Sequence, residues 1–250
     1  MTRQPTFVML HRRGIKALAG AAVFALVATG FIGFLHTSAG RPLLARLGVG
    51  CPVKRVSPLQ AEALRQRGVA AVRGTTPAPV RPALGMRLDD STEADVVAWA
   101  ARNAVTCKAI ALGLRQLQCQ NVPAAAFHPM EPMEPMAPMG PMASTPVDEL
   151  MFAFNPAGRL ISVDVLRMGL TPEIAAGLFT QQTGTLTATL GTAPVQVGDP
   201  SPAYLRAGAL RTVLATYRFA DYLASVTAMT LQAGVAVREQ YQSATPTRVQ

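Results

Sequence analysis

The stretch ELMFAFNPAGRLISVDVL, residues 149–166, contains two alternating apolar runs separated by a turn sequence. The turn sequence is Asn155-Pro156-Ala157-Gly158, whose residue types favour a tight reversal of the chain. Apolar side chains recur at every second position within each arm: Leu150, Phe152, Phe154, Ile161, Val163 and Val165. This alternation places them on one face of a β-hairpin. The stretch therefore predicts an antiparallel sheet with one apolar face that other elements must cover.

The sequence after the hairpin predicts one long helix and then three strands. Thr171, Pro172 and Glu173 have the residue types of a helix start. The helix should run to about Leu190, because Gly191 favours a helix end. Three strand-like runs follow, at residues 210–219, 222–230 and 235–241.

The sequence before the hairpin predicts a similar order of elements. A strand is expected at residues 84–88, followed by a helix at residues 91–103. Thr92 and Asp95 have the spacing of a capping box at the start of this helix. Two strands are then expected, at residues 105–111 and 114–122.

The order of a helix followed by strands thus occurs twice. We predict an α+β fold, in which an N-terminal transmembrane helix is followed by an antiparallel sheet with two packing helices. Residues 83–127 and 148–243 are interpreted as two α+β units, possible tandem copies of a helix-plus-meander arrangement. No motif assigns the chain to a family.

Cys107 and Cys119 stand at equal distances from Gly113, where the chain is expected to turn. Facing residues of an antiparallel pair lie about 4.5–5.5 Å apart, within the range that a disulfide tolerates. We therefore predict a Cys107–Cys119 disulfide in an oxidising compartment. The alternative is a pair of small buried apolar side chains. Cys51 is left over, and it is free, mispaired or linked to a second chain.

Residues 15–36 have the properties of a membrane anchor. Their central part, Ala17–Leu35, is nineteen residues long and carries no charge. A helix of that length rises about 28 Å, enough to cross the apolar core of a bilayer. Three basic residues stand directly before it: Arg12, Arg13 and Lys16. The positive-inside tendency then places the basic residues 1–14 in the cytoplasm.

Two other interpretations of this segment are a signal peptide cleaved after Thr37-Ser38-Ala39 and a twin-arginine export signal. We predict the anchor, because the apolar run is longer than the usual signal-peptide core of about 7–15 residues. All three interpretations place the bulk of the chain outside the cytoplasm. The anchor also has a ridge of small side chains through which two copies could associate: Ala17, Ala21, Ala25, Thr29 and Gly33.

Residues 37–82 are expected to form a short juxtamembrane helix and a proline-rich linker. The helix should begin at Pro58 after the capping residue Ser57 and end at Gly68. Residues 75–82 contain three prolines and predict an extended linker. The last residues, 244–250, are expected to be a disordered tail.

A Pro-Met-x repeat dominates residues 128–147. Proline at every third position excludes an α-helix and favours polyproline II, in which residues three apart lie about 9 Å from each other. This spacing hinders the convergence of several thioethers on one soft metal ion. We predict a stiff spacer or loop insertion, with a weak copper collector or a docking strip as alternatives. The candidate metal ligands are Met130, Met133, Met136, Met139 and Met142.

The charge distribution argues against nucleic-acid binding. Residues 1–81 carry twelve of the 23 basic residues and only one acid, Glu62, whereas residues 82–250 carry eleven basic and thirteen acidic residues. The net charges are therefore 12 − 1 = +11 and 11 − 13 = −2. A main domain with this charge distribution lacks the clustered positive charge that is needed to bind the phosphate backbone of a nucleic acid.

The residues expected to fold also contain few side chains from which a known catalytic arrangement could be built. The three histidines are His11, His36 and His128, all outside the residues expected to fold. Histidine-based catalysis and metal binding are therefore hard to build. Two carboxylate pairs remain: Asp89 with Asp90, expected to cap a helix, and Asp164 with Asp221.

We accordingly expect no enzyme and no cofactor. The sequence favours a single-pass protein of a bacterial inner membrane, held by Ala17–Leu35, with its C-terminal domain in the periplasm. The expected function is a non-catalytic binding or assembly module with a protein partner in the envelope. The alternative function is soft-metal handling through the methionine row.

Overall fold

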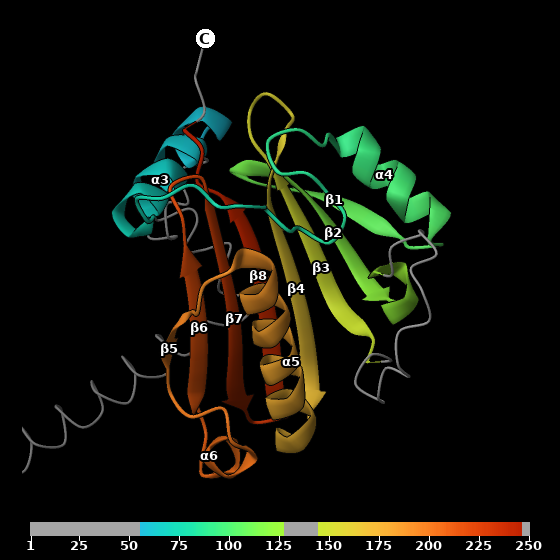
Figure 1. Cartoon of the computed structure of the whole chain (residues 1–250). Coiled ribbons are helices and arrows are strands. Elements are labelled where there is room, and N and C mark those ends of the chain that lie inside the picture. The colour runs from blue at the N-terminus through green and yellow to red at the C-terminus, as the bar shows by residue number, and fades with distance from the viewer. Residues whose placement is uncertain (1–55, 128–144, 247–250) are drawn as a thin grey trace, which may run out of the picture. The chain divides into compact units, whose positions relative to one another are not determined.

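A computed structural model describes residues 56–127 and 145–246 (Figure 1). The predicted anchor Ala17–Leu35, the five methionines of the Pro-Met tract and Cys51 lie outside these residues. Among the described helices, none combines the length and the apolar character needed to cross a membrane.

The described residues form one antiparallel sheet of eight strands, in the order β1-β2-β3-β4-β8-β7-β6-β5 (Figure 1). The strands are β1 (Cys107–Leu112), β2 (Leu114–Val122), β3 (Val147–Phe154), β4 (Leu160–Leu170), β5 (Val195–Val197), β6 (Thr212–Arg218), β7 (Tyr222–Leu231) and β8 (Gly234–Ser243). The helices are α3 (Pro58–Val72), α4 (Glu93–Arg102), η1 (Ala124–Phe127), α5 (Pro172–Leu190) and α6 (Pro202–Arg206). The predicted antiparallel sheet and α+β class are confirmed.

Residues 149–166 lie in the predicted hairpin, formed by β3 and β4. The side-chain oxygen of Asn155 accepts hydrogen bonds from the backbone N–H groups of Ala157 and Arg159, both at 3.0 Å, and this closes the turn. The pairing shifts its register next to Ala153 and Phe154, so Phe154 pairs with Leu160. The side chains of Phe152, Phe154 and Leu160 therefore all belong to the core.

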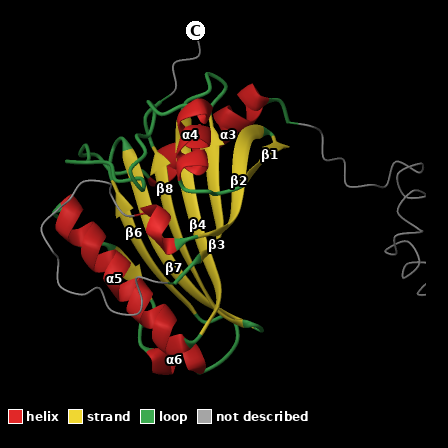
Figure 2. Cartoon of the chain, turned by 90° about the vertical axis from the view of Figure 1, so that its right-hand side faces the viewer, coloured by secondary structure: helices red, strands yellow, loops and turns green. Residues whose placement is uncertain are grey.

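Two helices cover the apolar face of the sheet. Figure 2 shows α5 lying along this face, and α4 packs over β2 and β3 at its upper end. The rings of Trp99 on α4 and Phe152 on β3 meet edge to face with centroids 5.7 Å apart. Thr92 and Asp95 form the predicted capping box of α4, and Thr171 caps α5. The fold thus buries the face that the alternation of apolar residues predicts.

The helix-then-strands order is present, with α4 before β1–β4 and α5 before β5–β8. The two groups of four strands meet where β4 pairs with β8. The sheet also continues across the Pro-Met tract, because β2 pairs with β3 from Arg115 and Phe154 to Val122 and Val147. The tract is therefore an insertion between two paired strands of one sheet.

Two local predictions are wrong. Residues 84–88 form turns in place of a strand, with positive φ angles at Leu84 and Gly85. Leu88 is buried in the core, so the apolar pattern marks an anchored loop. The first helix also continues through Gly68 to Val72, because Val69 is buried beneath it and holds the last turn against the protein.

The disulfide between Cys107 and Cys119 is present, and the two residues are direct partners in the β1–β2 register. It links the edge strand β1 to the sheet.

We expect a Cys107→Ala/Cys119→Ala variant of the full chain to lose about 2–3 kcal/mol of unfolding free energy, because the bond closes a short loop in the unfolded chain. Urea unfolding in detergent measures this loss, and the reduced wild type should match the variant. An equal midpoint for the oxidised and reduced wild type would contradict the prediction.

Candidate functional site

The face of the sheet opposite α5 is partly exposed in the described part of the chain. Register places alternate residues of each strand on this face, which is rich in amide, hydroxyl and flexible apolar side chains. Half-buried examples are Gln116, Gln118, Met151, Leu214, Thr216, Leu223, Ser225, Thr227, Met229, Gln240 and Gln242. The helix α3 covers one end of it, where Ala61 approaches Gly113 in the β1–β2 turn. The sheet thus presents a broad surface of mixed polarity.

A groove of about 200 Å³ lies on this face, between Val72 at the end of α3 and strands β6, β7 and β8. Thr216, Ser225 and Gln240 form one row across the three strands, since Ser225 is the register partner of the other two. Leu223 pairs with Gln242 in the adjacent row. The strand alternation creates this surface, because each outward residue stands between two core residues.

The groove offers hydrogen-bonding groups that the described residues leave available. The side chains of Ser225 and Gln242 make no hydrogen bond within residues 56–127 and 145–246, and Arg218 forms no ion pair there. Gln240 donates to Asp164 at 2.9 Å, and Arg238 also donates to Asp164. The hydrogen bond to this carboxylate raises the pKa of the Arg238 guanidinium.

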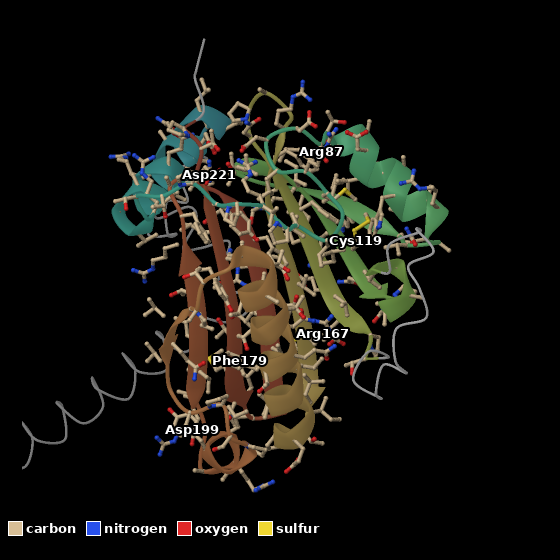
Figure 3. The ribbon with its side chains drawn as sticks, in the orientation of Figure 1. Arg87, Cys119, Arg167, Phe179, Asp199 and Asp221 are labelled. Atoms are coloured by element: carbon tan, nitrogen blue, oxygen red, sulfur yellow. A yellow bond between two sulfur atoms is a disulfide. The ribbon has the colours of Figure 1, made fainter. Side chains whose placement is uncertain are left out.

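The predicted carboxylate pair of Asp164 and Asp221 has separate partners. Asp221 accepts from the backbone N–H of Ala78 at 2.8 Å and lies 3.9 Å from the Arg81 guanidinium. Figure 3 shows Asp221 at the end of the sheet where α3 lies. Arg81 also bonds Asp89 at 2.7 Å. These contacts fix the loop before α4 to the sheet and give Asp221 a structural role.

The expected helix-capping role of Asp89 and Asp90 is wrong. Asp89 accepts from Arg81 and from the hydroxyl of Ser243 at 2.7 Å, and Asp90 pairs with Arg87 at 2.6 Å. The cap of α4 is supplied by Thr92. Asp89 is thus oriented by residues distant in the chain, whereas Asp90 pairs with Arg87, three residues before it.

A buried ionic cluster that the sequence patterns did not predict lies on the covered face of the sheet. Arg167 on β4 donates to Glu239 on β8, and the Tyr241 hydroxyl donates to the other oxygen of Glu239 at 2.7 Å. Glu239 is 1% exposed, and Arg167 lies beside α5 (Figure 3). The only signal in the sequence is an acid at an inward position of the alternating run Val235, Val237, Glu239.

The candidate metal ligands are not among the residues that the structure describes. Met130, Met133, Met136, Met139 and Met142 lie outside the described residues, so soft-metal handling stays a prediction. Within the described ranges, no group of three histidine, cysteine, aspartate or glutamate side chains could hold a metal ion.

Comparisons of the chain with known proteins find no matching protein family, no similar curated protein and no similar solved structure.

Proposed function

We propose that the protein is a non-catalytic binding or assembly module, anchored in a bacterial inner membrane through Ala17–Leu35, with residues 56–246 in the periplasm. The groove between α3 and strands β6–β8 is the observation that carries the binding role. We further propose that its ligand is an extended segment of another envelope protein.

The chemistry of the groove favours a polypeptide. Val72 and Leu223 supply apolar contacts, while Ser225 and Gln242 supply neutral donors and acceptors that can bond backbone amide groups. Such a combination of apolar contact and a few polar groups is typical of binding grooves. None of the described residues that line the groove is acidic, so the groove does not favour a cationic ligand.

The Cys107–Cys119 disulfide supports export of this part of the chain. Disulfides persist in the periplasm and in other oxidising compartments, whereas cytosolic thiols are kept reduced. The uncharged run Ala17–Leu35 with basic residues before it supports the anchor and its orientation.

Site-specific photo-crosslinking in native membranes tests this function. A crosslinking side chain at Gln242 is expected to give an adduct with one other envelope protein. The same side chain at Gln181, an exposed glutamine on α5, should not give this adduct. The Leu223→Glu substitution should reduce the Gln242 adduct at least about tenfold, because it places a charge among desolvated contacts.

A Gln181→Glu variant controls for the added charge and should keep the Gln242 adduct. Circular dichroism confirms that each variant is folded. Adducts formed only between copies of this chain, or adducts of equal yield from Gln242 and Gln181, would contradict the proposed binding groove.

A further inference from the structure

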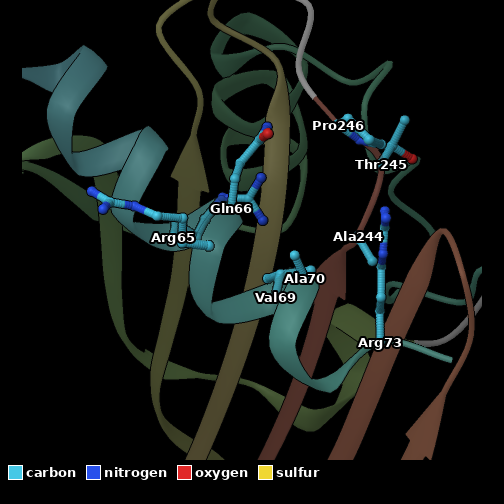
Figure 4. Close-up of a pocket in the computed structure, with 9 residues that line it drawn as sticks. Arg65, Gln66, Val69, Ala70, Arg73, Ala244, Thr245 and Pro246 are labelled. Carbon is cyan, nitrogen blue, oxygen red and sulfur yellow. The ribbon is translucent and has the colours of Figure 1, made fainter.

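A second cavity lies between α3 and the residues that follow β8 (Figure 4). Its volume is about 260 Å³, several times the ~30 Å³ that one water molecule occupies in the liquid. Val69 and Ala70 line it from α3, and Ala244 and Thr245 line it from the chain after β8. The cavity therefore has room for a small hydrated ligand.

The charged residues that line this cavity are all positive: Arg65, Arg67 and Arg73. Arg65 is already neutralised, because its Nε and Nη2 donate to the two oxygens of Glu62 at 2.8 and 2.7 Å. Its Nη1 donates to the backbone carbonyl of Ser243 at 2.8 Å. Arg65 thus holds α3 against the end of β8 and fixes the two walls of the cavity.

The other two arginines are not neutralised by any residue that the structure describes. Arg67 donates from Nε to the carbonyl of Ala63 at 3.4 Å, which leaves its terminal nitrogens available. Arg73 forms no ion pair within residues 56–127 and 145–246. An anion in the cavity that these two arginines line would be attracted to both positive charges.

Thr245 offers a positioned hydroxyl group on the opposite wall. Its Oγ1 accepts from Nη1 of Arg81 at 3.1 Å, and its backbone N–H donates to the hydroxyl of Ser243 at 3.2 Å. Because the Arg81 bond uses a lone pair, the hydroxyl hydrogen of Thr245 remains free to donate into the cavity.

We propose that this cavity binds a phosphate group through the guanidinium groups of Arg67 and Arg73 and the hydroxyl of Thr245. The forked donors of arginine match phosphate oxygens. Donors on two walls suit an anion whose oxygens point in several directions, which favours tetrahedral phosphate over a planar carboxylate.

The phosphate has two possible sources, the headgroup of an anionic lipid and free phosphate. The lipid source rests on the proposed membrane anchor, which ends at Leu35, 58 − 35 = 23 residues before α3 begins at Pro58. The phosphate site itself does not depend on the anchor or on the groove at Gln242.

Two measurements on the full chain test the site. Calorimetric titration in neutral detergent measures binding of inorganic phosphate. Native mass spectrometry, after reconstitution into phosphatidylcholine vesicles with added phosphatidylglycerol, counts the phosphatidylglycerol that the protein retains. Saturable phosphate binding would identify free phosphate as a ligand, and preferential retention of phosphatidylglycerol would identify the lipid headgroup.

In either case, an Arg67→Gln/Arg73→Gln variant should bind at least about tenfold more weakly, since each charged hydrogen bond contributes to the affinity. Arg102→Gln is the matched control, because Arg102 is also an exposed arginine near a helix end without an ion pair among the described residues. It should bind like the wild type. The absence of binding in both measurements, or binding that the double variant retains, would overturn the proposal. The crosslink from Gln242 should persist in the double variant, so the two proposals can fail separately.

Discussion

Replacing Glu239 with leucine is expected to lower the free energy of unfolding by about 3–5 kcal/mol. Glu239 is 1% exposed, and its carboxylate accepts a hydrogen bond from Arg167, which is 8% exposed. Its removal leaves a buried guanidinium without a counter-charge, and the Nε of Arg167 already lacks a hydrogen-bond partner among the described residues. The hydroxyl of Tyr241 also loses its acceptor. Urea unfolding of the full chain in detergent measures the loss.

Replacing both Arg167 and Glu239 distinguishes two contributions to the free energy of unfolding. One is the penalty for leaving one buried charge without its partner, and the other is the net contribution of the intact ion pair. An Arg167→Met/Glu239→Leu/Tyr241→Phe variant should recover most of the lost stability, because apolar side chains can replace a buried ion pair without large cost. Glu93→Ala provides the comparison at an exposed pair with Arg115 and should cost less than about 1 kcal/mol. A Glu239→Leu effect as small as the Glu93→Ala effect would show that the buried pair does not determine stability.

Raising the pH above about 10 is expected to destabilise the fold through Tyr222 and Tyr241. Burial raises the pKa of Tyr222, while nearby Arg81 partly offsets this effect. Burial also raises the pKa of Tyr241 well above its usual value, and the charge of Glu239 raises it further. In the unfolded chain both phenols ionise near pH 10, so unfolding releases protons above that pH. The contribution of the neutral phenols is complete below pH 10 and is lost as the pH rises toward the folded-state pKa.

Each of these tyrosines should contribute a loss of about 1.4 kcal/mol per pH unit above pH 10, or about 3 kcal/mol for the two. Urea unfolding at pH 9, 10, 10.5 and 11 measures the slope, with tyrosinate absorbance as a second signal. Tyr222→Phe loses the hydrogen bond to the carbonyl of Pro82, at about 1 kcal/mol, and should also lose about half of the slope. A slope that Tyr222→Phe leaves unchanged would contradict the assignment.

Local patterns predicted the elements that depend on neighbouring residues. The β3–β4 hairpin follows from the alternation around Asn155–Gly158, and α5 begins after Thr171 and ends before Gly191 as its capping residues indicate. The Cys107–Cys119 pair follows from equal spacing about Gly113, because an antiparallel register around a known turn determines which residues face each other.

Predictions failed where distant residues decide the conformation. The segment 84–88 has apolar residues at strand spacing, but its turn places Ala83 and Leu88 in the core. The groove was also missed, because it requires the end of α3 to meet β6–β8. The excess of basic residues before position 82 indicated contact with lipid headgroups. It did not indicate that Arg67 and Arg73 line one cavity, because this cavity requires α3 to pack against the residues after β8.

The antiparallel hairpins, the helix starts, the disulfide and the apolar face could be predicted from the sequence, because each depends on periodicity or spacing within a short stretch. The pairing of β4 with β8, the contact of Arg167 with Glu239 and the cavity between α3 and Thr245 could not be predicted in this way and follow from the folded arrangement. Those contacts join residues far apart in the chain, and their free energy comes from burying surfaces against each other once the sheet has formed. A single sequence records which side chains are apolar or charged, but it does not record which of them become neighbours.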